Sequence, residues 1–274
     1  MKKFQTALML LSLCGFCAAL QQPSSGNSKT TQPAGKHVPQ AKTHSEFNDY
    51  NAAYATAGGA AVEKAADEFA AKYPASELKA YLYAKAMHEY QNENNPPKML
   101  SVGEKVLQLD PDNSIALVLT STVLADSLND SDTDRESKIA RARKNATRAL
   151  ETVDSAFVPP ANATPGQVTA YKSTLQSMAH SALGIVALKT GDDATAENEL
   201  KLSTSLNVSQ PDPYLWYHLA LAQDHQKKYP EALVSINHAL QVMGGNTDLG
   251  ELAQGEQKRL LTLTGGSAPS PAPK

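Results

Sequence analysis

Cysteine is nearly absent from this chain of 274 residues, and both cysteines, Cys14 and Cys17, lie within the first twenty. Their CGFC spacing is typical of a thioredoxin-like redox pair. We expect no such activity, because the surrounding segment has the features of an export signal that is removed by cleavage. A lipid anchor is disfavoured because large residues, Leu13 and Phe16, precede the two cysteines.

Long hydrophobic runs are also missing. The most apolar stretch spans about residues 7–16 and is shorter than the ~20 residues that a membrane-spanning helix needs. Lys2 and Lys3 precede it, and small residues follow it at 17–19. We therefore predict that residues 1–19 are a cleaved signal peptide rather than a retained anchor, and that the protein is exported to the periplasm, the cell envelope or the exterior.

Charge is modest and balanced, with 25 basic against 28 acidic side chains and a net charge of −3. No run of Lys and Arg forms a basic stripe, and the sequence pI is about 6.2. These features exclude a typical nucleic-acid-binding surface, so we predict no nucleic acid partner.

Composition divides the rest of the chain into three parts. Residues 20–45 are rich in Gln, Ser, Thr, Pro and Gly and contain no acidic residue, which predicts a disordered linker. Residues 265–274, GGSAPSPAPK, predict a second disordered tail. Between them, apolar residues of 46–264 recur at intervals of three and four, without sustained β-branched alternation, which predicts an all-α domain.

Several helix ends can be read directly from the sequence. Pro74 and Pro111 each follow a helical run, and Gly191 stands at an expected C-terminal cap. Thr164 and Gln167 form a predicted capping box around a proline at the first helical turn. The predicted helices are mostly 12–20 residues long with short links, so helical hairpins in series are expected.

The sequence also repeats. A shift of 36 residues pairs His180 with Trp216, Leu183 with Leu219, Gly184 with Ala220, Ala187 with Gln223, Ala196 with Ala232, and Leu200 with Ile236. Together with the stretch from 81 to 113, which ends LQLDPDN, this pattern resembles the tetratricopeptide repeat, W-x2-L-G-x2-Y, then A-x3-F, then P. The best copy runs from Trp216 to Leu240, where Gln223 departs from the aromatic of the motif.

The resemblance covers most of residues 60–243 and implies an antiparallel helix-pair solenoid wound as a right-handed superhelix. Small residues at helix crossings would face large ones, so that stacked pairs bury a continuous core. Residues 248–263 carry five leucines with charged residues between them, as expected of a terminal capping helix whose apolar side packs on the array.

The histidines of the best copy do not form a site. His218 and His225 are seven residues apart, whereas helical metal pairs use i, i+4 spacing, and His238 lies on a different helix. We expect these three to face water, and we expect His180 to be partly buried because it matches Trp216. His88-Glu89 lacks the second histidine of a zinc-protease helix.

One turn, LADSLNDSDTDRES, leaves two interpretations open. It holds three aspartates at alternate positions, Asp130, Asp132 and Asp134, as at the start of a calcium loop. The places where such a loop needs Gly and Glu hold Arg135 and Arg141. The alternative is a helix start, in which Thr133 and Glu136 form a capping box.

No nucleophile elbow or phosphate-binding glycine loop occurs, so we predict neither an enzyme nor a cofactor or metal site. The resemblance instead implies a protein-interaction scaffold of the cell envelope that binds a peptide or partner helix along its concave face. The outward positions implied for that face are Tyr81, Lys85, His88, Asn92, Lys189, Tyr214, Tyr217, His218, Asp224 and His225. An enzyme accessory or a ligand carrier with a site between repeats is the alternative.

Overall fold

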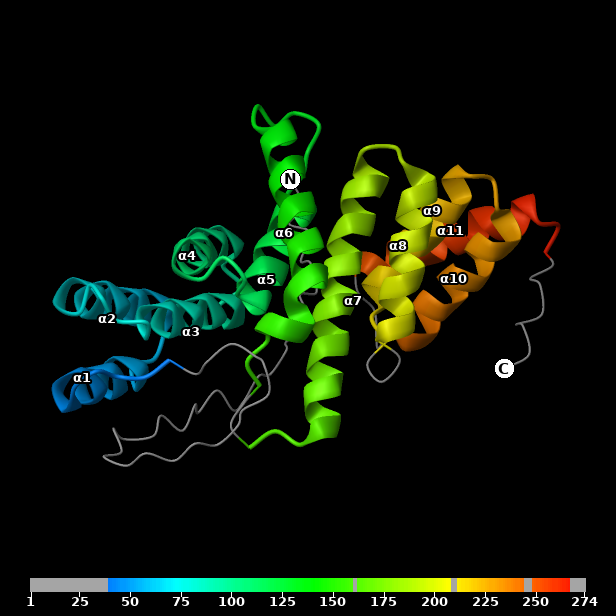
Figure 1. The fold of residues 1–274 in the computed structure, drawn as a ribbon. Helices are drawn as coiled ribbons and strands as arrows, with labels where there is room; N and C mark the ends of the chain where they lie inside the picture. The colour runs from blue at the N-terminus through cyan, green and yellow to red at the C-terminus, as the bar shows by residue number, and fades with distance from the viewer. Residues whose placement is uncertain (1–38, 160–161, 208–210, 244–247, 267–274) are drawn as a thin grey trace. The chain divides into compact units, whose positions relative to one another are not determined.

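The computed structural model of the chain describes residues 39–159, 162–207, 211–243 and 248–266, and these residues form eleven helices and no strand (Figure 1). The helices are α1 (His44–Tyr54), α2 (Gly59–Lys72), α3 (Lys79–Asn92), α4 (Pro96–Leu109), α5 (Ser114–Asp126), α6 (Arg135–Ala156), α7 (Pro165–Lys189), α8 (Asp193–Leu206), α9 (Pro213–His225), α10 (Tyr229–Val242) and α11 (Asp248–Leu263). The predicted all-α class is confirmed. The predicted signal peptide and most of the predicted linker and tail lie outside the described residues.

The first helix begins at His44, two residues before the predicted start of the helical domain. Thr43 is its N-cap, and its hydroxyl oxygen accepts a hydrogen bond of 3.1 Å from the Glu46 amide. The Lys42 amide donates to the Glu46 carboxylate at 2.7 Å. Local capping therefore sets this boundary.

The predicted helix ends are confirmed. The Thr164 amide donates to Gln167 Oε1 at 2.8 Å, and the Gln167 amide donates to Thr164 Oγ1 at 3.3 Å, which is the reciprocal capping box. Gly191 has a φ of 78°, the left-handed conformation that ends many helices. Pro74 and Pro111 each stand two residues beyond the end of a helix.

Three helix pairs, α3–α4, α7–α8 and α9–α10, are joined by the same turn. In each, an amide donates back to a carbonyl at 2.9 Å: Asn95 to Tyr90, Asp192 to Ala187, and Lys228 to Gln223. The preceding residue has positive φ in every case: Asn94 (50°), Gly191 (78°) and Lys227 (61°). The repeat read from the sequence is thus also a repeat of backbone geometry, with Ala187 and Gln223 at equivalent positions.

The chain divides into two compact units, and each is described by itself. The first unit comprises the described parts of 39–124 and 147–175, and the second comprises those of 125–146 and 176–266. In the first unit α2 packs against α1 and α3, and α3 packs against α4. In the second unit α9 packs between α8 and α10, and α10 packs against α11.

Small residues allow these helices to approach closely. A Cβ added at Gly184 in α7 would lie 2.7 Å from Leu200 Cγ in α8. In the first unit a Cβ at Gly103 in α4 would lie 2.5 Å from Thr120 Cγ2 in α5. Both distances are far below a normal carbon contact, so packing requires glycine at these two crossings.

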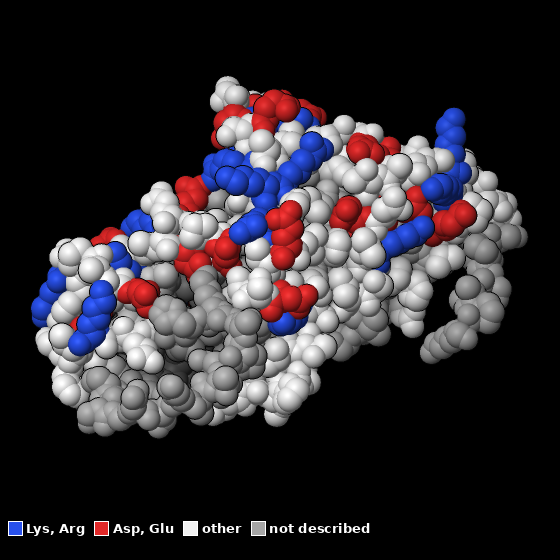
Figure 2. All heavy atoms as spheres, in the orientation of Figure 1, with Lys and Arg blue, Asp and Glu red and all other residues white. Residues whose placement is uncertain are grey.

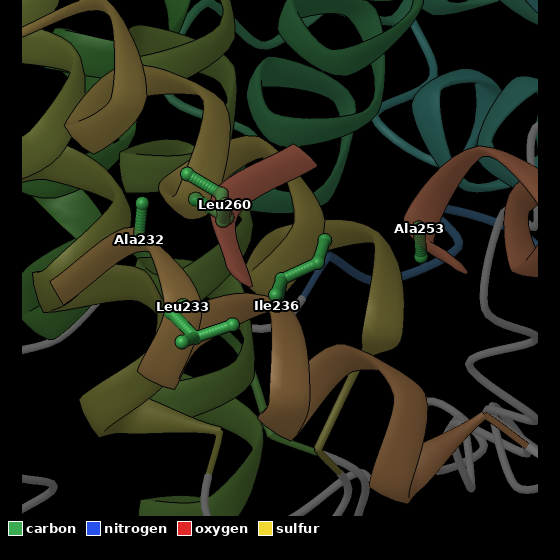
Figure 3. Packing of buried hydrophobic residues seen from close by; sticks show 6 residues of the cluster. Ala232, Leu233, Ile236, Ala253 and Leu260 are labelled. Carbon is green, nitrogen blue, oxygen red and sulfur yellow. The ribbon is translucent and has the colours of Figure 1, made fainter. Parts of the chain in front are cut away.

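The interior of the second unit includes one cluster from α9, α10 and α11, part of which is shown in Figure 3. Its buried members are Ala220, Ala232, Leu233, Ile236, Ala253 and Leu260. The residues that carry the repeat pattern are therefore core residues, as predicted.

The terminal helix α11 departs from the expected cap. Leu260 is buried, but Leu252, Leu261 and Leu263 are 42%, 37% and 47% exposed. The prediction that the leucines of this helix pack on the array is therefore wrong for three of the five. A helix has only one side against its neighbour, and these leucines lie to either side of that contact.

Charged side chains of both signs are interspersed over the face seen in Figure 2. Among the described helices, none combines the length and the apolar character that crossing a bilayer requires.

Candidate functional site

The residues predicted to bind a partner fall into both units. Tyr81, Lys85, His88 and Asn92 lie on α3 in the first unit and are called the α3 row below. The others lie in the second unit: Lys189 on α7, and Tyr214, Tyr217, His218, Asp224 and His225 on α9. The two groups differ in what their side chains contact.

Side chains of the α3 row make local contacts. Lys85 Nζ lies 3.0 Å from Glu89 Oε1, one helical turn away, and 5.2 Å from the ring centre of Tyr54 on α1. Asn92 Nδ2 lies 3.3 Å from His88 Nδ1, again one turn away. Asn92 itself is exposed. The polar contacts of Lys85 and Asn92 thus come from α3 and its neighbour α1, and Tyr81, Lys85 and His88 are partly buried.

Tyr81 begins the α3 row and is half-buried. Burial, followed by the nearby carboxylates of Asp110 and Glu77, raises the pKa of Tyr81 to about 12. Its hydroxyl therefore keeps its proton at physiological pH and can donate a hydrogen bond.

In the second unit, the Lys189 side chain caps the C-terminal end of α5. Its ammonium group donates to the backbone carbonyls of Ala125 at 3.0 Å, Asp126 at 2.7 Å and Leu128 at 3.2 Å. These carbonyls lie at and just beyond the last turn of the helix, where such groups lack intrahelical partners. Lys189 therefore uses all three of its protons inside the unit.

Tyr214 and Asp126 form a second link between helix ends. The Tyr214 hydroxyl donates to Asp126 Oδ1 at 2.9 Å. Burial raises the pKa of Asp126 to about 6, although the Tyr214 hydrogen bond and the Lys189 ammonium oppose the shift. Burial and the charge of Asp126 raise the pKa of Tyr214 in turn. Asp212 caps α9 through the Tyr214 amide at 2.9 Å, and burial raises its pKa as well.

His218 does not face water, which corrects the prediction. Its Nδ1 lies 2.9 Å from the Tyr214 carbonyl oxygen, and its ring centre lies 4.1 Å from that of Tyr214 and 5.3 Å from that of Tyr217. Burial lowers the pKa of His218 to about 4, so the imidazole is neutral under ordinary conditions. The helical-wheel argument failed because it assumed solvent on the side of α9 where these tyrosine rings lie.

Three further histidines, His180, His225 and His238, have packing or pairing partners. His238 stacks on Trp216 with ring centres 4.6 Å apart, so it does not simply face water as predicted. His180 is partly buried, as predicted, and its Nδ1 lies 2.7 Å from Glu199 Oε2. His225 is exposed, with Nδ1 2.9 Å from Asp193 Oδ1 on α8.

Asp224 also forms an ion pair within the second unit. Its carboxylate pairs with Arg259 on α11, which in turn binds Glu256 at 2.8 Å and 3.0 Å. Of the predicted positions on α9, only His225 is exposed, whereas Tyr214, Tyr217, His218 and Asp224 are partly buried.

All three aspartates of the turn before α6 have a cation nearby, and Asp130 Oδ1 lies 3.4 Å from the Arg135 guanidinium. Lys138 Nζ lies 2.9 Å from Asp132 Oδ2 and 3.2 Å from Asp134 Oδ1. The helix begins at Arg135, so the residue before it is Asp134 rather than the predicted cap Thr133. Within the described residues, no group of three or more His, Cys, Asp or Glu side chains is arranged to hold a metal ion.

Sequence reasoning missed Asp126 and Tyr54. Asp126 is the last residue of an otherwise apolar helix, where the helix dipole disfavours a carboxylate. That placement is a usable sign of a specific partner. Nothing local points to Tyr54, because its contact with Lys85 depends on how α1 packs.

No protein-family model and no curated protein matches this sequence. Among solved structures, the chain is similar to a thermophilic TPR protein from Thermus thermophilus, with a TM-score of 0.46 and 15% sequence identity. The similarity covers 77% of this chain and 98% of that one. The chain's own repeated turns and small-to-large interior pairs make its fold tetratricopeptide-like.

Proposed function

We propose that this chain is an exported, non-catalytic interaction protein of the cell envelope that binds a peptide or a partner helix along the α3 row. The observation that carries the proposal is the local nature of the row's contacts. Pairs one turn apart on a helix, such as Lys85 with Glu89, stabilise it by only about 0.2–0.5 kcal/mol. A bound segment can replace such contacts at little cost to the fold.

The polar groups of α9 are less suitable for binding. A partner could bind the side chains of Lys189, Tyr214 or Asp224 only if their contacts with α5 and α11 were broken. Leaving buried polar groups unpaired costs about 1–3 kcal/mol each. The binding surface is therefore assigned to α3, with His225 as the exposed residue of α9.

The chemistry of the α3 row fits a polypeptide ligand. Tyr54 and Tyr81 provide apolar area together with hydroxyl groups, and tyrosine is enriched at protein interfaces for this reason. Lys85 adds a positive charge, and Asn92 provides both donor and acceptor atoms. The export of the protein rests on the predicted signal at residues 1–19.

Site-specific photo-crosslinking tests this proposal. A photoreactive amino acid at position 92 is expected to capture a discrete partner in the native host. The matched control is position 64 on α2 of the same unit, where Lys64 is exposed and pairs only with Glu68. Equal capture from both positions, or none from position 92, would rule out the α3 row. Circular dichroism of both variants checks that helical content is kept.

A further inference from the structure

The terminal helix α11 concentrates the exposed apolar surface of the second unit. The described residues hold five large hydrophobic side chains that are exposed, and three of them, Leu252, Leu261 and Leu263, lie on this helix. Leu252 and Leu263 are eleven residues apart, which places them on nearly the same side of the helix. Exposed apolar side chains that share one helix face typically mark an interaction surface.

Gly255 lies near the middle of the same helix and is exposed. A Cβ placed there would meet no atom within 4 Å, so packing within the described chain does not require glycine. Glycine in a helix interior costs about 1 kcal/mol relative to alanine. The close approach of another helix would explain why glycine stands at position 255. Close helix contacts explain Gly184 and Gly103 in the interior in the same way.

The charges of α11 are ordered along the helix. Asp248 and Glu251 stand in the first turn, whereas Lys258 and Arg259 stand in the second half. Arg259 is already paired with Asp224 and Glu256, but Glu251 and Lys258 are exposed and make no ion pair among the described residues. A helix that runs antiparallel and carries the same order of charges would complement this one. A second copy of the chain provides such a helix.

We propose that two copies of this protein associate by antiparallel packing of their α11 helices, with a two-fold axis beside Gly255. Glu251 precedes that residue by four positions and Lys258 follows it by three, and seven residues return a helix to nearly the same side. Glu251 of each copy then lies opposite Lys258 of the other, so the charge pair forms twice. Leu252 lies beside the seam and is shielded from water, whereas Leu263 lies beyond the end of the partner helix. This association is independent of binding at the α3 row.

Analytical ultracentrifugation of the purified protein over a concentration series tests the proposal. The wild type is expected to be a dimer at the higher concentrations, and Leu252→Glu is expected to shift it to monomer. Leu202→Glu is the matched control, because Leu202 on α8 is 47% exposed and has no place in the interface. A monomeric wild type at all concentrations would overturn the proposal.

A charge exchange tests the antiparallel arrangement itself. Glu251→Lys places like charges opposite each other at both symmetric positions, so the dissociation constant is expected to rise at least several-fold. Adding Lys258→Glu to the same chain restores opposite charges and is expected to restore the dimer. Failure of the double variant to recover, while circular dichroism shows intact helices, would refute this pairing.

Discussion

Asp126 is a side chain whose ionisation state depends on the fold. Its pKa of about 6 compares with an ordinary value of 3.8, and burial is the main cause. A carboxyl group whose pKa is raised on folding stabilises the folded chain while it is protonated. Its contribution is complete below pH 3.8 and is lost as the pH rises through about 6. His218 has the opposite sign, since its lowered pKa costs stability as the pH falls below the ordinary value of 6.5, and the loss is complete below about pH 4.

Asp126→Asn removes the charge but keeps an oxygen to accept the Tyr214 hydroxyl. We expect the variant to gain about 1–3 kcal/mol of unfolding free energy near pH 8 and to match the wild type within about 0.5 kcal/mol near pH 3.5, below the ordinary pKa of the carboxyl group. Urea denaturation at the two pH values measures this difference. Asp130→Asn is the control, because the Asp130 side chain is fully exposed. An equal effect of Asp126→Asn at both pH values would contradict the assigned burial.

At the scale of the element, the helices and their ends could be predicted because the signals are local. The capping box at Thr164 and the cap at Gly191 involve residues only a few positions apart. The polar contacts of the second unit could not be predicted in this way. Lys189 binds a carbonyl 63 residues earlier, and Tyr214 binds a carboxylate 88 residues earlier. Periodicity shows which side of a helix is apolar, but it does not show what covers the opposite side.

Two glycines of α7 allow the interior packing to be tested. Gly184→Ala is expected to lower the unfolding free energy by about 1 kcal/mol, because overpacking against Leu200 outweighs the gain in helix propensity. Gly166→Ala has open space around the new Cβ and is expected to stabilise the protein by up to about 1 kcal/mol. Thermal unfolding of the two variants gives the comparison. Stabilisation by both would mean that α7 and α8 do not approach as closely as described.

At the scale of the whole molecule, three helices belong to both compact units. The division falls within α5, α6 and α7, so none of these helices is confined to one unit. Unfolding one unit alone would interrupt α6 and α7 in their interiors, where the backbone hydrogen bonds are cooperative. The two units are therefore expected to unfold together.

The single tryptophan provides a direct measurement of this coupling. Trp216 lies in the second unit and stacks on His238, so its fluorescence reports the unfolding of that unit. Far-ultraviolet circular dichroism reports all the helices. We expect both signals to change with the same midpoint in urea. Two separated midpoints would show that the units unfold independently, as long repeat arrays can.

The turn shared by three helix pairs has a consequence for changes of chain length. Its closing hydrogen bond recurs at Asp192 and Lys228, 36 residues apart, with a positive-φ residue just before each. An insertion or deletion of 36 residues at this point keeps the matched small and large positions of these two repeats in register. An insertion or deletion of another length rotates the following helices by up to half a turn. Apolar side chains that are buried in the repeat then become exposed. At this place the number of helix pairs can therefore change in steps of 36 residues.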